Sequence, residues 1–257
     1  APDDFTNNLD DERTYRELDV QFTISYLDNT SETIVLCNPV YIYRPALALV
    51  HGLDGDVSTF QYCRYTNNSN GESVFDPSFL WKVSKRFDLE EFGSFQTNAE
   101  LLLNVGADED SPYENSLLKL IEEMHIMGIA NKRIDYVAHS MGGAAGRTAI
   151  NYGNSWYNPG VQFKNYGNGY INKFITVCTP HNGSLLADLA VDIFPFLPLI
   201  PGFGLTYSSA TFFDNIGFIT KSGNLAPAVI NMQSNVEGVP FITTNVKNHL
   251  IASDVDE

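Results

Sequence analysis

Positive charge is scarce in this chain of 257 residues. Only 15 Lys and Arg side chains stand against 31 Asp and Glu, which gives a formal net charge of −16. Such an excess of negative charge repels phosphate backbones and anionic lipid headgroups at long range. We therefore expect that nucleic acid is not a partner of this protein.

Long apolar runs and cysteines are also few. The most apolar stretch, residues 194–205, is interrupted by three prolines, so no segment approaches the roughly 20 residues needed to span a bilayer. The three cysteines leave two alternatives: a Cys37–Cys63 disulfide, or three unpaired thiols with Cys178 in the core, because Cys178 continues an apolar strand pattern. The chain starts at Ala1 without a methionine or an apolar presequence, which is typical of a processed, secreted protein.

Length and apolar content indicate one α/β domain over residues 1–257, because 44% apolar residues can fill a single large core. Residues 20–26 alternate between apolar and polar, and residues 33–37 follow a turn, which predicts a half-buried antiparallel hairpin. Ala46–Val50 is a short continuous apolar run, as expected of a strand buried on both faces of a parallel sheet.

Further elements are predicted along the chain. Residues 79–87 have the composition of a helix. Ser111 can cap a second helix, with Glu114 closing a capping box and Gly128 ending it. Further buried strands are predicted at Arg133–Ala138, Phe174–Cys178 and Val239–Val246.

The sharpest chemical signal is Ala138-His139-Ser140-Met141-Gly142, at the junction of a buried strand and a helix rich in small residues. A serine at such a junction is held in a strained turn and points out from the carboxyl edge of the sheet, where it can act as a nucleophile. Acyl transfer also needs two backbone N–H groups directed at the oxyanion. Met141, next to the serine, can supply one, and Leu53 in His51-Gly52-Leu53 the other. His51 precedes the nucleophile, so we expect it to brace the loop.

These residues resemble the bacterial true lipases and their esterase relatives in the α/β-hydrolase superfamily. The resemblance rests on short motifs in a fixed order, which are His51-Gly52-Leu53, Ala138–Gly143, Thr179-Pro180-His181-Asn182-Gly183-Ser184, Leu225-Ala226-Pro227 with Asn231, and Gly238-Val239-Pro240. It implies an α/β-hydrolase fold, a mostly parallel sheet flanked by helices and a carboxylic ester substrate. It also implies a structural role for the histidine at position 181.

The fold delivers its triad in the order serine, acid, histidine, and this order leaves the other two members open. The family places its acid after the seventh strand, which makes Asp254 the first candidate and Asp256 the second. The histidine would then follow residue 257. The alternative takes His249 as the base, and it needs an earlier acid such as Asp192 or Asp214.

By the same resemblance, residues 185–220 form an apolar lid or cap, or else plain core. A lid would suit a lipid or small-molecule ester and at most transient contact with a lipid–water interface. No cofactor or metal is expected. The predicted function is therefore a serine carboxylester hydrolase of the lipase or esterase type. The alternatives are a noncatalytic binding protein, or an acyltransferase or polyester depolymerase, on the same scaffold.

Overall fold

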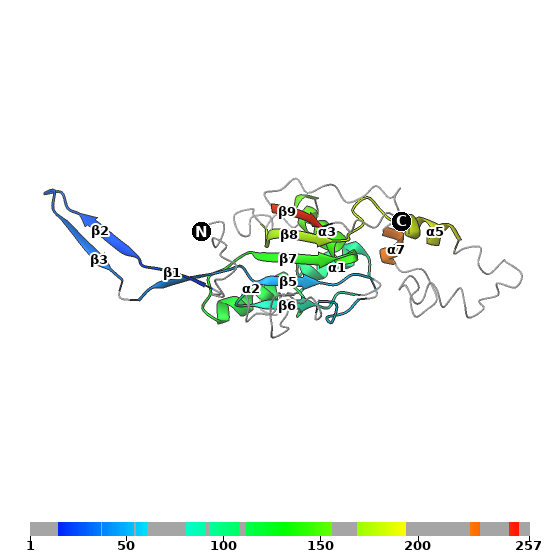
Figure 1. Ribbon diagram of the computed structural model, residues 1–257, viewed down its shortest axis with the longest axis horizontal. Coiled ribbons are helices and arrows are strands. Elements are labelled where there is room, and N and C mark those ends of the chain that lie inside the picture. Colours follow the sequence, from blue (N-terminus) through cyan, green and yellow to red (C-terminus); the bar gives the residue numbers. More distant parts are fainter. Residues whose placement is uncertain are drawn as a thin grey trace, which may run out of the picture.

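A five-stranded parallel sheet forms the centre of the protein (Figure 1). The computed structural model describes residues 15–36, 38–53, 55–60, 81–90, 93–107, 112–155, 169–193, 227–231 and 247–251. The strand order is β6-β5-β7-β8-β9. In that order the strands span Ser84–Phe87, Leu47–Val50, Ile134–His139, Ile171–Val177 and Lys247–Ile251. The predicted α/β class with a parallel sheet is confirmed.

Three helices cover one face of the sheet: α1 (Phe95–Leu102), α2 (Leu117–Ile126) and α3 (Met141–Ser155). Successive side chains of a strand point to opposite faces. Ala48 and Val50 of β5 accordingly pack in the helical layer, whereas Leu47 and Leu49 pack on the other side of the sheet. Both faces of β5 are buried, as its continuous apolar run predicts. None of the helices in the described part of the chain is long and apolar enough to cross a membrane.

Two of the predicted helices differ from the structure. Residues 84–87 form the edge strand β6, not part of a helix, because they pair with β5 and the buried Phe87 aligns with Val50. Helix α2 begins later than predicted: the Ser116 side chain accepts the Lys119 N–H at 3.1 Å, and Ser111 lies outside the described residues. The predicted end at Gly128 is confirmed, with φ of +76° at that glycine.

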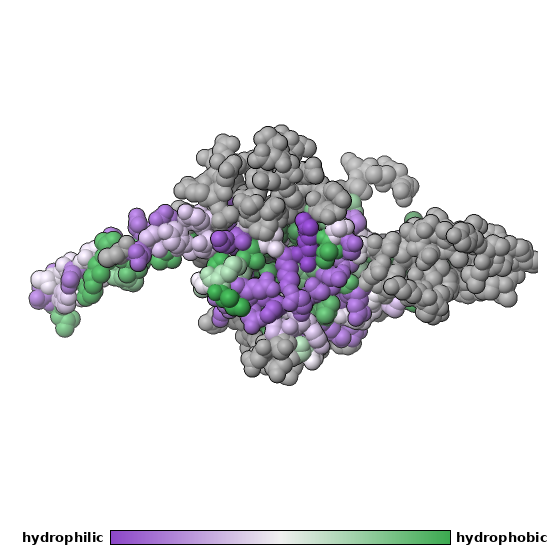
Figure 2. Space-filling view, turned by 90° about the horizontal axis from the view of Figure 1, so that it is seen from below, coloured by the Kyte–Doolittle hydropathy of each residue, from purple (hydrophilic) through white to green (hydrophobic). Residues whose placement is uncertain are grey.

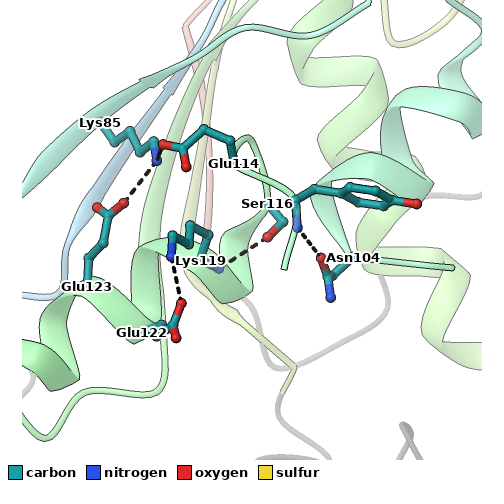
Figure 3. Close-up of polar contacts among 8 residues, drawn as sticks. Lys85, Asn104, Glu114, Ser116, Lys119, Glu122 and Glu123 are labelled. Atoms are coloured by element: carbon teal, nitrogen blue, oxygen red, sulfur yellow. Dashed lines mark hydrogen bonds and ion pairs between the residues drawn. The ribbon is translucent and has the colours of Figure 1, made fainter. Parts of the chain in front are cut away.

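Glu114 contributes an ion pair rather than a capping box. Its carboxylate lies 2.6 Å from Lys85 Nζ, and Glu123 of α2 binds the same ammonium group at 3.0 Å (Figure 3). Lys85 belongs to β6, so the pair ties α2 to the edge of the sheet. The two carboxylates lower the energy of one partly buried cation.

A long antiparallel ribbon precedes the sheet and projects away from it (Figure 1). Its base pairs β1 (Tyr15–Leu18) with β4 (Val40–Tyr43), and its outer part pairs β2 (Gln21–Ser25) with β3 (Ser31–Val35). The predicted hairpin is confirmed, but its predicted half-burial is wrong: every residue of β2 and β3 is exposed, and 55% of Phe22 is accessible to solvent. Figure 2 shows apolar residues on the surface of the ribbon.

A buried carboxyl group lies near the start of β7. Asp135 is 6% exposed, and Asn172 Nδ2 donates to its Oδ1 at 2.8 Å. Burial raises the pKa of this carboxyl above its usual range, against smaller opposing effects of Asn172 and nearby cations. The folded state therefore binds the proton more tightly than the unfolded state does.

We expect Asp135→Asn to stabilise the protein increasingly as the pH rises. A raised pKa means that the stability contributed by the protonated group is complete below the unfolded value and is lost as the pH rises through the folded value. The amide that replaces the carboxyl group stays neutral and keeps an acceptor oxygen at every pH. Urea unfolding of both proteins between about pH 4 and pH 7.5 measures the difference. Asp28→Asn is a control of opposite sign. Hydrogen bonds from Thr30 lower the pKa of Asp28, so this variant should lose stability relative to the native protein as the pH rises. A difference for Asp135→Asn that does not change with pH would contradict the prediction.

Candidate active site

Ser140 occupies a sharp turn between β7 and α3. Its φ angle is +50°, a left-handed conformation that costs a non-glycine residue free energy. The Ser140 N–H donates to Val177 O of β8 at 2.9 Å, and the Ser140 carbonyl accepts the Gly143 N–H at 3.0 Å. The turn is thus held by the sheet on one side and by the first turn of α3 on the other.

Small residues in α3 allow this close approach. A Cβ atom on Gly142 would lie 2.8 Å from Val50 O and nearer still to His51 O. On Gly143 it would collide with the Thr179 side chain, and on Gly146 it would lie 2.5 Å from the Tyr136 ring. The helix start is therefore seated directly on the ends of β5 and β8.

The loop after β5 touches the serine. A Cβ atom on Gly52 would lie 2.7 Å from Ser140 Cβ. His51 is 1% exposed; its Nδ1 bonds to the Gly52 carbonyl at 2.8 Å, and its Nε2 accepts the Leu89 N–H at 3.1 Å. The predicted bracing role of His51 is confirmed, because both ring nitrogens bond to backbone groups.

Peptide geometry fixes where the next amide points. The Gly52 carbonyl also accepts the Gly55 N–H at 3.2 Å, so two donors hold it in place. The N–H of a trans peptide points opposite to its C=O. The Leu53 N–H is therefore directed away from His51 and Gly55. Met141 begins α3, where an amide has no acceptor within the helix, and its own side chain is fully buried.

His181 is built into the scaffold, as its family counterpart implies. Its Nε2 lies 3.0 Å from Thr176 Oγ1, and Arg147 Nη1 lies 3.3 Å from its Nδ1 and donates to its carbonyl at 2.8 Å. Burial and the Arg147 charge lower the pKa of His181. Its ring is occupied in joining β8 to α3.

The other three histidines lie in different parts of the fold. His139 precedes the serine, and burial lowers its pKa, while His125 bonds to Asn131 O beyond the amino ends of the strands. His249 lies inside β9, aligned with Ile175, whereas the strand predicted at residues 239–246 would have placed it after a strand. Its role as a candidate base stays a prediction. The predicted strand at residues 239–246 falls outside the described residues.

The acids fall in two groups. Asp254, Asp256 and Asp214 lie outside the described residues, so their roles stay predictions. Asp192 is exposed near the end of α5 (Leu185–Ile193), which lies with α7 (Pro227–Asn231) beyond the carboxyl ends of the strands (Figure 1). Of the predicted lid, residues 185–220, the structure describes only α5, in which Leu185 is 83% exposed. The role of this segment as a lid stays a prediction.

Cysteine positions differ in part from expectation. Cys178 is not a core residue: it follows β8 with an exposed thiol and φ of +50°. It is the residue after Val177, which aligns with His139, so the neighbouring strands β7 and β8 are each followed directly by a left-handed residue. The strand pattern gave no signal for this turn. Cys37 and Cys63 lie outside the described residues.

Solved structures similar to this chain include three bacterial lipases. Lipase BlEst2 of Bacillus licheniformis in its mature form is 21% identical, with 74% of this chain and 55% of that chain covered and a TM-score of 0.40. The Staphylococcus hyicus lipase is 14% identical, with 74% of this chain and 60% of that chain covered and a TM-score of 0.35. Lipase 1 from Pelosinus fermentans is 19% identical, with 76% of this chain and 58% of that chain covered and a TM-score of 0.32. The chain thus spans less than two thirds of the length of each. No protein with a curated description matches it.

A family model described as "Putative serine esterase (DUF676)" matches residues 47–192. The match covers more than half of the chain. It includes the loop His51-Gly52-Leu53, the turn at Ser140 and the segment that contains His181. The predicted resemblance to serine esterases is confirmed, and the chain belongs to this serine esterase family.

Proposed function

We propose that this protein hydrolyses carboxylic esters through a covalent acyl-enzyme on Ser140. The observation that carries the proposal is the left-handed serine at the carboxyl end of β7, in contact with the Gly52 loop. Ser140 Oγ attacks the ester carbonyl carbon and its proton passes to a base. The tetrahedral intermediate expels the alcohol, and water then releases the acid and regenerates the serine.

The oxyanion is proposed to bind between the N–H groups of Leu53 and Met141. The Leu53 N–H points away from the two donors that hold the Gly52 carbonyl, and the Met141 N–H lies at the free start of α3. Both amides are fixed before substrate binds, and fixed donors need little reorganisation as charge develops on the oxygen. This pre-organisation supports the proposed pair of donors.

Asp254 is proposed as the acid of the triad, with Asp256 second. It is the third residue after β9, and the chain leaves β9 at the same edge of the parallel sheet as it leaves β7 before Ser140. A carboxylate following a strand at this edge can orient a histidine beside the serine. The net charge of −16 favours neutral esters over anionic ones. Residues 185–220 are proposed as the apolar cover of the site.

A fluorophosphonate probe tests the proposed nucleophile. We expect the probe to modify the full-length protein at Ser140, because the serine displaces fluoride from phosphorus as it attacks an ester carbonyl. Ser140→Ala should remain unlabelled, and Cys178→Ser, which removes the neighbouring exposed thiol, should label normally. Mass spectrometry of the labelled peptide identifies the modified residue. Labelling that persists in Ser140→Ala would reject the assignment, and a protein that is never labelled would support a noncatalytic binding role.

A further inference from the structure

A pocket of about 610 Å³ opens at the amino ends of the strands, opposite to Ser140. The loop from α2 to β7 forms most of its wall, and Pro45 and Asn172 complete it from the residues before β5 and in β8. Its volume is within the range of small-molecule sites. Since β7 has six residues, its two ends lie about 20 Å apart. The pocket is therefore separate from the proposed active site.

The lining of this amino-end pocket is unusual for so acidic a protein. It contains Arg133, Lys132 and His125, and none of its nine lining residues is Asp or Glu. Close by, Arg44 and Lys173 act together with Arg133 on the buried carboxyl of Asp135. Four Lys and Arg side chains thus lie in or beside the pocket, in a chain with only 15 of them. The lining itself therefore contains cationic side chains and no carboxylate, a composition that suits an anion.

Arg133 is the group best placed to bind it. Its Nη2 donates to the Ile171 carbonyl, which fixes the side chain, whereas its Nε is shielded from solvent and has no hydrogen-bond partner. No ion pair joins Arg133 to a carboxylate of the described residues. Burial lowers the pKa of the guanidinium group, and the nearby Asp135 carboxyl opposes this effect only in part. An anion would compensate that charge.

Two further features select the kind of anion. Pro45, Ile129 and Ala130 provide an apolar wall, which suits a ligand with a hydrocarbon part. The last turn of α2 ends at the pocket through His125 and Gly128, and the negative end of a helix dipole opposes the binding of any anion, but a doubly charged one more than a singly charged one. We propose that the amino-end pocket binds a monocarboxylate with a short apolar tail, its carboxylate on Arg133 and its tail along Pro45, Ile129 and Ala130.

Sodium hexanoate, at constant ionic strength, tests this assignment through the amide chemical shifts of ¹⁵N-labelled protein. We expect saturable shifts at residues 128–133 with a Kd of about 1–10 mM. Because shifts are assigned residue by residue, binding here is distinguished from binding near Ser140. Ser140→Ala should bind equally well, so this proposal and the proposed function can fail independently.

Two pairs of variants locate the charge. Arg133→Met should weaken binding at least about tenfold, whereas Arg86→Met, which removes an exposed cation of β6, should not. Since loss of the Arg133–Ile171 bond could unfold the protein, a second pair keeps Arg133. Ala130→Glu should weaken binding about tenfold relative to Ala130→Gln, because only the glutamate repels a carboxylate.

Three results would overturn the assignment. Hexan-1-ol that shifts the same amides with equal affinity would show an apolar site without anion recognition. Inorganic phosphate that binds more tightly than hexanoate would show a site for inorganic anions. Absence of saturable shifts at residues 128–133, or unchanged affinity in Ala130→Glu, would remove the pocket as a carboxylate site.

Discussion

Ser140→Gly is expected to abolish ester hydrolysis and to make the protein more stable. Loss of the nucleophile should reduce kcat/KM by about 10⁴- to 10⁶-fold, the range seen when a serine nucleophile is removed. The gain in stability has a different origin: at φ of +50°, serine carries a steric strain that glycine does not. We expect the free energy of unfolding to rise by about 1 kcal/mol.

Ser140→Ala separates the two effects. Alanine also lacks the hydroxyl, but it keeps a Cβ atom, so it should lose the same activity without the gain in stability. Hydrolysis of 4-nitrophenyl butyrate and urea unfolding measure the two quantities on all three proteins. If Ser140→Gly were no more stable than Ser140→Ala, the turn would not be strained. If either variant kept a kcat/KM within about 10²-fold of the native value, another residue would be the nucleophile.

Gly142→Ala is expected to cause the second-largest loss of activity. The new methyl group would press on the carbonyl oxygens of His51 and Val50, which are backbone atoms and cannot rotate away. To relieve the collision, the start of α3 must separate from the loop that carries Leu53. That movement would spread the two proposed oxyanion donors, and loss of one such donor costs about 10²- to 10³-fold in rate.

Gly128→Ala is the matched control for this variant. No atom lies within 4 Å of the position that its Cβ would take, but φ is +76°, so alanine there should cost about 1 kcal/mol of stability at the end of α2. It should leave kcat/KM for 4-nitrophenyl butyrate unchanged, because α2 ends at the opposite edge of the sheet. Gly142→Ala with activity within about threefold of the native protein would contradict the proposed donor pair.

The buried strands and the nucleophile turn could be predicted because their signals are local. Leu47–Val50 is a continuous apolar run, and Ile134–His139 is rich in apolar residues. The turn after β7 is indicated by a serine among small residues. Strand β6 could not be recognised in this way. Its sequence Ser-Lys-Arg-Phe is mostly polar, and it becomes a strand through pairing with β5, which is a non-local contact.

Positions that depend on register or on packing partners were also beyond local reasoning. His249 falls inside β9 because pairing with β8 forms a strand at Lys247–Ile251, where the local sequence pattern predicted none. Alternation in Gln21–Ser25 shows that the two faces of the strand differ, but it does not show that anything covers the apolar one. The amino-end pocket combines residues from segments far apart in the sequence and has no linear motif.

The projecting ribbon offers a site for attaching labels that is remote from the proposed active site (Figure 1). Its outer turn is closed by the Tyr26 N–H to Thr30 carbonyl bond at 2.8 Å and by Asp28, which accepts from the Thr30 amide, while Leu27 is fully exposed. Neither the serine turn nor the amino-end pocket uses a residue of this hairpin. A fluorophore or an affinity tag inserted at Asp28-Asn29 would therefore label or immobilise the protein without entering either site.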